Sequence, residues 1–389
     1  ALALASAAPR PSAAPEAPVA EAPAAGATQE IDRLTAREMQ SAAVRHLPFL
    51  PGEIGIDDGG IRMQGHAGAP EGLTANMAFF VNGRRFDRVE YPVRDPELAS
   101  RFTEVRGMGN VVRAAMTQHL DELRQARFWR FDASPTGRYV ASHWRQAFHF
   151  MNPAFERAPM PPAPNIQRVI GDTSAVRFAM GGATIFKNIE AYLAELGHGW
   201  ADFPRILDWG CGAGRVTRYM LGETGCSVTG ADIDPDNIAW CRRAYPDGRF
   251  EQVPLRPPTV FEDGAFDLVV GLSVLTHLRE DDQWLWLDEL RRVVRPGGLA
   301  FLSVQGPAQF AYNRFPPHLY RQVQERGYLD LSRDGALDAV IGDTEYYRAA
   351  MHSRAYITER WSRYFEVVAI VDAIAGMQDF VVLRRRPLA

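Results

Sequence analysis

One stretch near the middle of the chain constrains the fold more than any other: the glycine-rich run Asp208–Gly214. Residues 205–207 read as the end of a buried strand before it, and residues 215–221 read as an amphipathic helix after it. Glycine lets the backbone approach a ligand closely, and the first turn of a helix offers N–H groups without partners inside the helix. The order strand, glycine-rich turn, helix therefore predicts a nucleotide-binding turn within an α/β unit.

A second strand follows at the spacing that such a unit requires. Residues 226–231 are predicted to form it, and Asp232 ends it, about 20 residues beyond the glycines. An acid at this strand end can accept hydrogen bonds from the hydroxyls of a ribose. A nicotinamide dinucleotide site is the alternative interpretation. It is weakened by Arg215, which stands where that motif has its third glycine.

Later segments continue the alternation of strands and helices. Residues 249–253 read as a third strand, residues 265–273 as a fourth, and residues 286–298 as a helix ended by Pro-Gly-Gly. With the glycine-rich run, these segments resemble the motifs of class I S-adenosylmethionine (SAM) dependent methyltransferases, over roughly residues 169–385. The resemblance implies an enzyme with SAM as cofactor. It also implies a doubly wound, Rossmann-like α/β sheet of seven strands with an antiparallel last strand.

The resemblance also assigns the site residues. It implies cofactor contacts from Asp208, Gly210, Cys211, Gly212, Gly214, Arg215, Asp232 and Ile233. Ser273 and His277 are the candidate catalytic residues, because ligands bind beyond the carboxyl ends of the strands in open α/β sheets. His277 can serve as a base for an acceptor hydroxyl, or as a structural residue that contacts backbone or cofactor. Many family members hold the adenine amine with an Asp after the third strand, whereas this chain has Leu255 and Arg256 there.

Other matches indicate the class of acceptor. Gln305-Gly306, Gln378-Asp379 and the pair Phe178 and Gly182 resemble positions in a bacterial subgroup that modifies glycans. We therefore expect O-methylation of a sugar hydroxyl or a glycosylated metabolite. Natural-product O- or N-methylation and a catalytically inactive binding subunit stay open as alternatives. Six aromatic residues could stack on a sugar ring or belong to the core: Trp284, Trp286, Tyr312, Tyr320, Tyr346 and Tyr347.

Three segments are expected along the chain. Residues 1–29 are rich in Ala and Pro and read as a disordered linker, of the kind that follows another module. Residues 30–150 read as a helix and then short strands with turns such as Asn82-Gly83, which predicts a β-sandwich-like accessory domain. Residues 151–389 hold the methyltransferase domain. Within it, we expect helices over 172–196 that break at Gly181-Gly182, and a helical lid over the acceptor at about 307–354.

Composition limits the partners. The net charge of −4 argues against a nucleic-acid groove, and no apolar stretch is long enough to span a membrane. Three cysteines without a pairing framework indicate a reducing compartment, so we expect a cytoplasmic protein. The histidines are scattered, which predicts no metal site. The expected partners are a small-molecule or glycan acceptor, with a homo-oligomer or a larger multidomain assembly left open.

Overall fold

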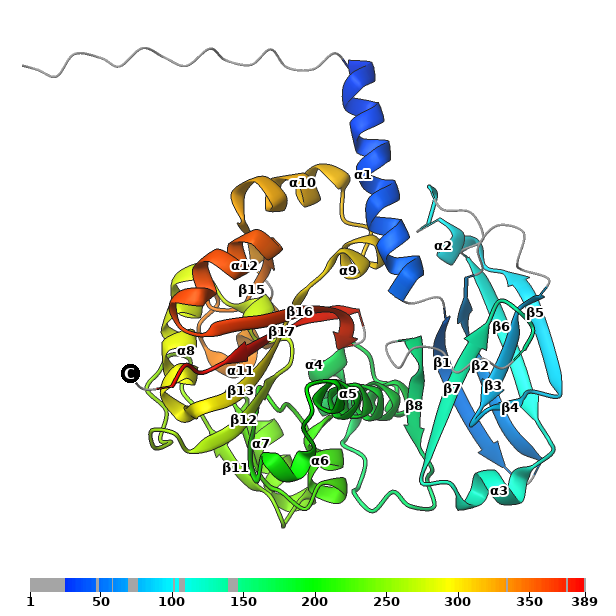
Figure 1. Ribbon diagram of the computed structural model, residues 1–389, viewed down its shortest axis with the longest axis horizontal. Helices are drawn as coiled ribbons and strands as arrows, with labels where there is room; N and C mark the ends of the chain where they lie inside the picture. The colour runs from blue at the N-terminus through cyan, green and yellow to red at the C-terminus, as the bar shows by residue number, and fades with distance from the viewer. Residues whose placement is uncertain are drawn as a thin grey trace, which may run out of the picture.

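The computed structural model describes residues 25–46, 49–57, 59–68, 76–100, 102–104, 109–138, 146–333, 335–375 and 377–387. A strand-rich part and a larger part with a helix-flanked sheet lie side by side, and helix α1 (Ala25–His46) lies above them (Figure 1). Most of the expected linker, residues 1–24, is outside the described residues. Its expected end at residue 29 is wrong, because α1 already begins at Ala25.

The strand-rich part consists of two antiparallel sheets of four strands each. The first has the order β1-β2-β6-β5, with bounds β1 (Phe49–Asp57), β2 (Gly60–Ala67), β5 (Arg88–Arg94) and β6 (Asn110–Met116). The second has the order β4-β3-β7-β8, with bounds β3 (Ala78–Val81), β4 (Arg84–Arg85), β7 (Phe128–Ser134) and β8 (Phe148–Met151). Helices α2 (Pro96–Ala99) and α3 (Leu120–Gln125) lie in the connections. The predicted turn Asn82-Gly83 joins β3 to β4, and both residues have the positive φ (46° and 77°) that a two-residue hairpin turn requires.

The larger part is built on a seven-stranded sheet with the order β11-β10-β9-β12-β13-β17-β16. Strands β9 to β13 are parallel, whereas β17 pairs antiparallel with both β13 and β16. This confirms the predicted sheet and its antiparallel last strand. The bounds are β9 (Arg205–Trp209), β10 (Ser227–Asp232), β11 (Arg249–Gln252), β12 (Phe266–Gly271), β13 (Val294–Gln305), β16 (Glu366–Ala375) and β17 (Gln378–Arg384).

Helices cover both faces of this sheet because its strands are apolar on both sides. Adjacent residues of β9 show this: Ile206 belongs to one buried cluster and Leu207 to the other. The helices are α4 (Ala163–Ile170), α5 (Ala175–Glu195), α6 (Thr217–Glu223), α7 (Pro235–Ala244), α8 (Glu280–Val293) and α12 (Arg354–Arg360). The short helical turns are η3 (Trp200–Asp202), η4 (Leu275–His277) and η6 (Trp361–Arg363).

The expected break in helix α5 is wrong. The helix runs through Gly181 and Gly182 without interruption. A Cβ at Gly182 would overlap the backbone oxygen of Arg215 and would lie 2.9 Å from Cε2 of Tyr219. Gly182 is therefore a close-packing position where α5 meets the loop after β9, and not a helix break.

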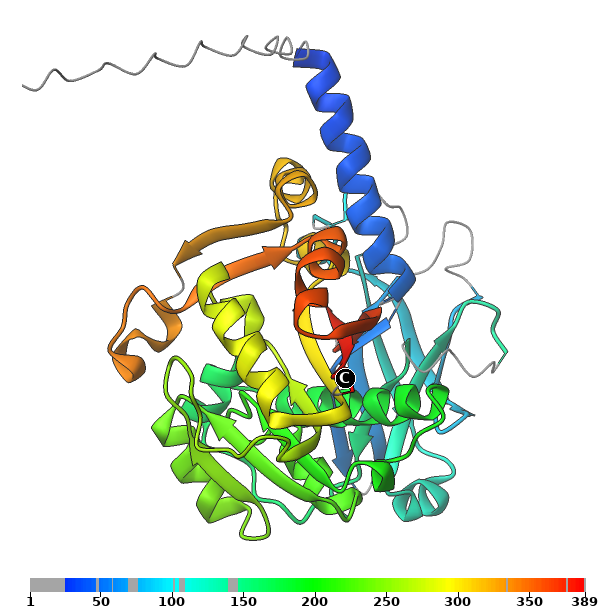
Figure 2. The same ribbon diagram turned by 60° about the vertical axis from the view of Figure 1, so that its left-hand side comes forward.

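An insertion between β13 and α12 covers one side of the sheet (orange in Figure 2). It contains α9 (Pro307–Tyr312), α10 (Pro317–Arg326), β14 (Tyr328–Arg333), the turn η5 (Gly335–Leu337), α11 (Asp338–Ile341) and β15 (Arg348–His352). Strands β14 and β15 form an antiparallel hairpin. The sequence had suggested a helical lid, but the insertion contains this hairpin as well as helices.

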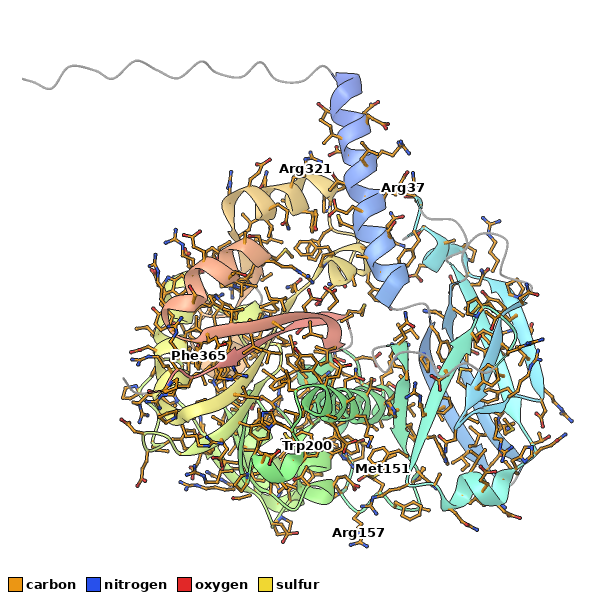
Figure 3. All side chains as sticks on the ribbon, in the orientation of Figure 1. Arg37, Met151, Arg157, Trp200, Arg321 and Phe365 are labelled. Carbon is orange, nitrogen blue, oxygen red and sulfur yellow. The ribbon has the colours of Figure 1, made fainter. Side chains whose placement is uncertain are left out.

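The two parts of the chain share apolar cores. One cluster joins the sandwich residue Phe79 to Met39 of α1 and to Phe310 and Val323 of the insertion. A second cluster contains Met151, at the end of β8, and Trp200, and Figure 3 shows these two side chains at the junction of the two parts. Figure 3 also shows Arg321 on α10 near α1, where its Nη1 lies 2.5 Å from Oδ1 of Asp32.

Candidate active site

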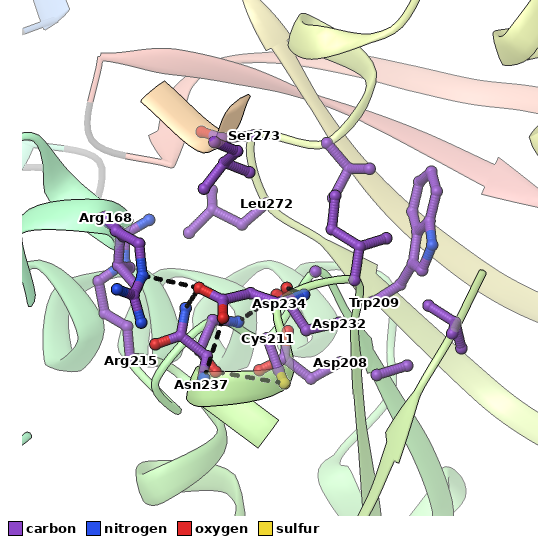
Figure 4. Close-up of a pocket in the computed structure, with 18 of the residues that line it drawn as sticks. Arg168, Asp208, Trp209, Cys211, Arg215, Asp232, Asp234, Asn237, Leu272 and Ser273 are labelled. Atoms are coloured by element: carbon purple, nitrogen blue, oxygen red, sulfur yellow. Dashed lines mark hydrogen bonds and ion pairs between the residues drawn. The ribbon is translucent and has the colours of Figure 1, made fainter. Parts of the chain in front are cut away.

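A pocket lies at the carboxyl ends of β9, β10 and β12, where a doubly wound sheet is expected to bind its ligand (Figure 4). It encloses about 910 Å³ of space with its open mouth included. Its wall comes from the turn after β9, the ends of β10 and β11, the segment after β12, helix α4 and the insertion.

The glycine-rich turn supplies the floor of the pocket. Gly210, Gly212 and Gly214 have φ of 75°, 53° and 83°, which side chains other than glycine rarely adopt. The turn is also crowded: a Cβ at Gly212 would lie 2.6 Å from Val169 Cγ2, and one at Gly214 would lie 2.5 Å from Tyr245 Cε2. Helix α6 begins only at Thr217, two residues after the expected start at Arg215. Glycine is therefore required where this turn packs closely on Val169 and Tyr245.

Asp232, at the end of β10, is held in place by two backbone donors. Its Oδ2 accepts a hydrogen bond from the N–H of Gly212 at 2.7 Å, and its Oδ1 accepts one from Asp234 at 2.8 Å. Burial raises the pKa of Asp232 to about 6, although these N–H groups act in the opposite direction. The carboxylate is thus fixed at the pocket wall before any ligand binds.

A charged pair of side chains lies beside the glycine-rich turn. Asp208 is buried and accepts a hydrogen bond from the hydroxyl of Thr217. Burial raises the pKa of Asp208 to about 6, although the Thr217 bond and the charge of Arg215 lower it. Burial also lowers the pKa of Arg215 to about 10. Within the described part of the chain, Arg215 forms no ion pair and its buried Nε has no hydrogen-bond partner.

Helix α4 closes one side of the pocket, although its residues were not predicted to belong to the site. Arg168 lines the pocket, and its Nε lies 2.8 Å from Oδ2 of Asp234, the N-cap residue of α7. Asn165 also donates to Asn237 of α7 at 2.8 Å. Figure 4 shows Arg168 and Arg215 on the same side of the pocket, away from Trp209. Proline residues at the start of α4 and apolar residues at helical spacing, such as Ile166 and Ile170, could have indicated this helix.

Ser273 lies in the pocket wall in a left-handed conformation, with φ of 58°. Its N–H donates to the hydroxyl of Ser303 at 2.7 Å, and its own hydroxyl donates to Oε1 of Gln378 at 3.0 Å. Ser303 donates to the same Oε1 at 2.6 Å. The single proton of the Ser273 hydroxyl is therefore committed to Gln378, and its lone pairs are left to accept.

The structure does not bring all predicted residues into the pocket. Among the described residues that line it, every predicted cofactor residue is present except Gly214, and of the two candidate catalytic residues Ser273 is present but His277 is not. The ring of His277 stacks on Tyr347, with centroids 4.1 Å apart and planes at 7°, and its Nδ1 lies 3.0 Å from the carbonyl oxygen of Arg348. Tyr347 itself lines the pocket. His277 is thus adjacent to the pocket, behind an aromatic side chain.

The remaining predicted residues divide between pocket and core. Trp286, Tyr346 and Tyr347 line the pocket, whereas Trp284 stacks on Tyr364 and Tyr320 lies against α1 through Glu38. Two of the three matches to the glycan-modifying subgroup meet in register, because Gln305 pairs with Gln378 across β13 and β17. Asp379 accepts from the N–H of Ala373 and from Arg354, and burial raises the pKa of its carboxyl.

Two kinds of feature are absent from the described residues. No helix among them is long and apolar enough to cross a membrane. No group of three or more His, Cys, Asp or Glu residues among them is arranged to hold a metal ion. The cysteines Cys211, Cys226 and Cys241 are free thiols.

Comparisons with known proteins agree with the motifs. Residues 207–302 match the family described as a methyltransferase domain. A demethylmenaquinone methyltransferase from Chlorobaculum tepidum is 32% identical over 105 residues, which are 25% of this chain and 40% of that protein. A probable S-adenosylmethionine-dependent methyltransferase from Mycolicibacterium smegmatis is 30% identical over 137 residues, 34% of this chain and 49% of that protein.

Structural comparison gives weaker likenesses. A SAM-dependent methyltransferase structure from Methanosarcina mazei has 21% identity and a TM-score of 0.35, covering 48% of this chain and 94% of that one. The chain spans about half or less of the two curated relatives named above. The matched region is a SAM-dependent methyltransferase domain, and SAM is its cofactor.

Proposed function

We propose that this SAM-dependent methyltransferase methylates a hydroxyl group of a small-molecule acceptor, and that a sugar or a glycosylated metabolite is the acceptor class. The observation that carries the proposal is the pocket itself. It combines the glycine-rich turn, the fixed carboxylate of Asp232 and the hydroxyl of Ser273 at the carboxyl ends of three adjacent strands. A cytoplasmic location belongs to the same proposal, and the three free thiols support it.

The residues present fit SAM. Arg215 is a buried cation whose Nε lacks a partner within the described chain, so an anionic group such as the carboxylate of the cofactor would satisfy it. Asp208, an acid beside the same turn, suits an ammonium group. Asp232 has lone pairs left after its two backbone bonds and can accept from ribose hydroxyls. We assign these three side chains and the glycine-rich turn to the cofactor.

The chemistry divides between cofactor and chain. When bound, SAM supplies a methyl group that the positive sulfur activates toward displacement. The chain must then align the acceptor and exclude water. Because the Ser273 proton is bound to Gln378, Ser273 can accept a hydrogen bond from an acceptor hydroxyl and orient its oxygen. We assign this positioning role to Ser273.

The removal of the acceptor proton by His277 stays a prediction. The carbonyl of Arg348 favours a proton on Nδ1, so in a neutral ring the lone pair is on Nε2. The ring nevertheless lies behind Tyr347 and outside the pocket wall. A His277→Gln variant tests the role: a base requires a large loss of turnover with unchanged cofactor affinity.

The experiment has two stages on the full chain. Isothermal titration with S-adenosylhomocysteine (SAH) should show binding, and Asp232→Asn should weaken it by about tenfold or more. Methyl-labelled SAM is then offered with sugars and glycosides, and in parallel with polyketide and peptide acids. Label on a sugar hydroxyl supports the proposal, whereas label only on the acids favours natural-product methylation. Binding of SAH with no label on any acceptor favours a binding subunit.

A further inference from the structure

The insertion contributes a wall to the cofactor pocket. Leu337, Tyr346 and Tyr347 line it together with Val253, which follows β11. Leu337 and Tyr346 are buried, at 8% and 2% exposure, so their side chains are packed between the pocket and the body of the domain. The expected lid over the acceptor is therefore, in this part, a fixed wall beside the end of the third strand.

Tyr346 is hydrogen-bonded to Leu255, which stands where many family members carry the adenine-binding acid. Its hydroxyl donates to the backbone oxygen of Leu255, and Nε1 of Trp286 donates to the same oxygen at 3.1 Å. A carbonyl oxygen has two lone pairs, so both are engaged by side chains of the protein. Leu255 therefore offers neither a carboxylate nor an unengaged carbonyl lone pair to a ligand.

Arg256, the second residue at that position, is also committed. Its guanidinium pairs with Asp282 of α8 at 2.5 Å and lies 3.8 Å from Asp343 of the insertion. It also lies over the ring of Tyr346, 5.3 Å from the centroid. Arg256 thus fixes the insertion to the body of the domain and points its charge at carboxylates of the protein.

A second set of contacts holds the next residues of the insertion. Glu345 pairs with Arg279 at 3.3 Å and with Arg348 at 3.1 Å. The ring of Tyr347 stacks on His277, which in turn contacts the carbonyl of Arg348. Residues 343–348 are therefore tied to the body of the domain on both sides of the pocket-facing tyrosines.

The residues that line the pocket are of two kinds. One set is charged: Arg168, Asp208, Arg215, Asp232 and Asp234. The other set is apolar or aromatic: Val253, Val274, Leu278, Trp286, Leu337, Tyr346 and Tyr347. A flat, weakly polar base has its best partners in the second set, because stacking on aromatic side chains stabilises any base through its face.

We infer that the insertion forms the adenine wall of the cofactor pocket, and that the described residues hold the base by apolar and aromatic contact, with no side chain among them that reads its amino group. This rests on the proposed function, since it assumes that the pocket binds SAM. Leu337 and Tyr347 are the contact residues. Tyr346, Trp286 and Arg256 are positioning residues that hold the wall in place.

The first test measures SAH binding by isothermal titration with the full chain. Leu337→Ala and Tyr347→Ala should each weaken SAH by about tenfold or more. Ile341→Ala is the matched control, because Ile341 lies in the same insertion and packs on the core that contains Tyr346, without lining the pocket. The SAH affinity of Ile341→Ala should stay within about threefold of that of the unchanged protein, because this substitution removes only packing contacts. Equal weakening by Ile341→Ala, or no weakening by the two wall variants, overturns the inference.

The second test uses the unchanged protein and so does not depend on how the variants fold. The 6-deamino analogue of SAH, with unsubstituted purine in place of adenine, lacks the amino group and keeps ring nitrogen N1 as an acceptor. Without a side chain that reads this group, the analogue should bind within about tenfold of SAH. A site built to hydrogen-bond a group can reject an analogue lacking it by about 10⁴-fold, so a preference for SAH above about 100-fold overturns the inference. If the unchanged protein binds neither compound, the proposed function fails instead.

Discussion

Replacing Gly182 with alanine adds one methyl group where helix α5 touches the loop that leads from β9 into α6. The new Cβ would overlap the backbone oxygen of Arg215 and would approach Tyr219 to 2.9 Å. A backbone oxygen cannot rotate away, so either the helix or the loop must shift. Gly181, one residue earlier, provides the matched control, since its nearest atom to a new Cβ is Nη1 of Arg215 at 4.0 Å.

The two variants are expected to change stability in opposite directions. Alanine is better than glycine inside a helix by about 0.5–1 kcal/mol, so Gly181→Ala should raise the free energy of unfolding by that amount. Gly182→Ala has the same stabilisation from helix propensity, but overpacking a tight interior costs about 1–3 kcal/mol. The net effect relative to the unchanged protein therefore lies between no change and a loss of about 2.5 kcal/mol. The pair should therefore differ by at least about 1 kcal/mol.

Urea unfolding, followed by tryptophan fluorescence, measures both free energies. SAH titration gives a second readout, because the shifted loop carries Arg215 and the glycine-rich turn. Gly182→Ala should weaken SAH, whereas Gly181→Ala should leave its affinity within about threefold. If Gly182→Ala unfolds at the same or a higher urea concentration than Gly181→Ala, the close approach of α5 to the loop is wrong.

Three further predictions concern single groups of the site. Burial raises the pKa of Asp232 above its unfolded value, so the folded protein binds more protons than the unfolded chain between about pH 4 and 6. This group therefore adds stability as the pH falls through that range. Asp232→Asn should flatten the pH dependence of the urea midpoint there. Ser303→Ala leaves the N–H of Ser273 without its acceptor and should lower the free energy of unfolding by about 1–3 kcal/mol in urea titrations, and a loss under 0.5 kcal/mol would contradict the network. Tyr346→Phe removes one of two donors to Leu255 and should lower the unfolding free energy by about 0.5–1.5 kcal/mol, with a drop in thermal midpoint as the measurement.

The parts of the site that lie close in sequence were predictable. The glycine-rich turn, Asp232 and the cap at Asp234 fall within one strand–helix–strand unit, and local backbone chemistry determines their arrangement. The seven-stranded sheet followed from the alternation of elements together with the resemblance. The end of that sheet at which the pocket opens then followed from its topology.

What could not be predicted depends on contacts between distant segments. Arg168 reaches the pocket because α4 packs on the start of α7, about 70 residues away in the chain, as the bond from Asn165 to Asn237 shows. The prediction of a helix break at Gly182 was wrong. That glycine is present because α5 packs closely on the backbone of Arg215, and not because the helix ends there. His277 was expected at the reaction centre from strand position alone, and only the fold of the insertion shows that Tyr347 stands in front of it.

The strand-rich part is connected to the cofactor pocket through the insertion between β13 and α12. Phe310 and Val323 of the insertion and Met39 of α1 belong to one buried cluster with the sandwich residues Phe79 and Trp129. The strand-rich part therefore cannot separate from the larger part without exposing helices of the insertion to water. This exposure costs about 25 cal/mol for each Å² of apolar surface. The insertion also supplies Leu337 and Tyr346 to the pocket, so a single segment of the chain both packs on the strand-rich part and lines the cofactor site.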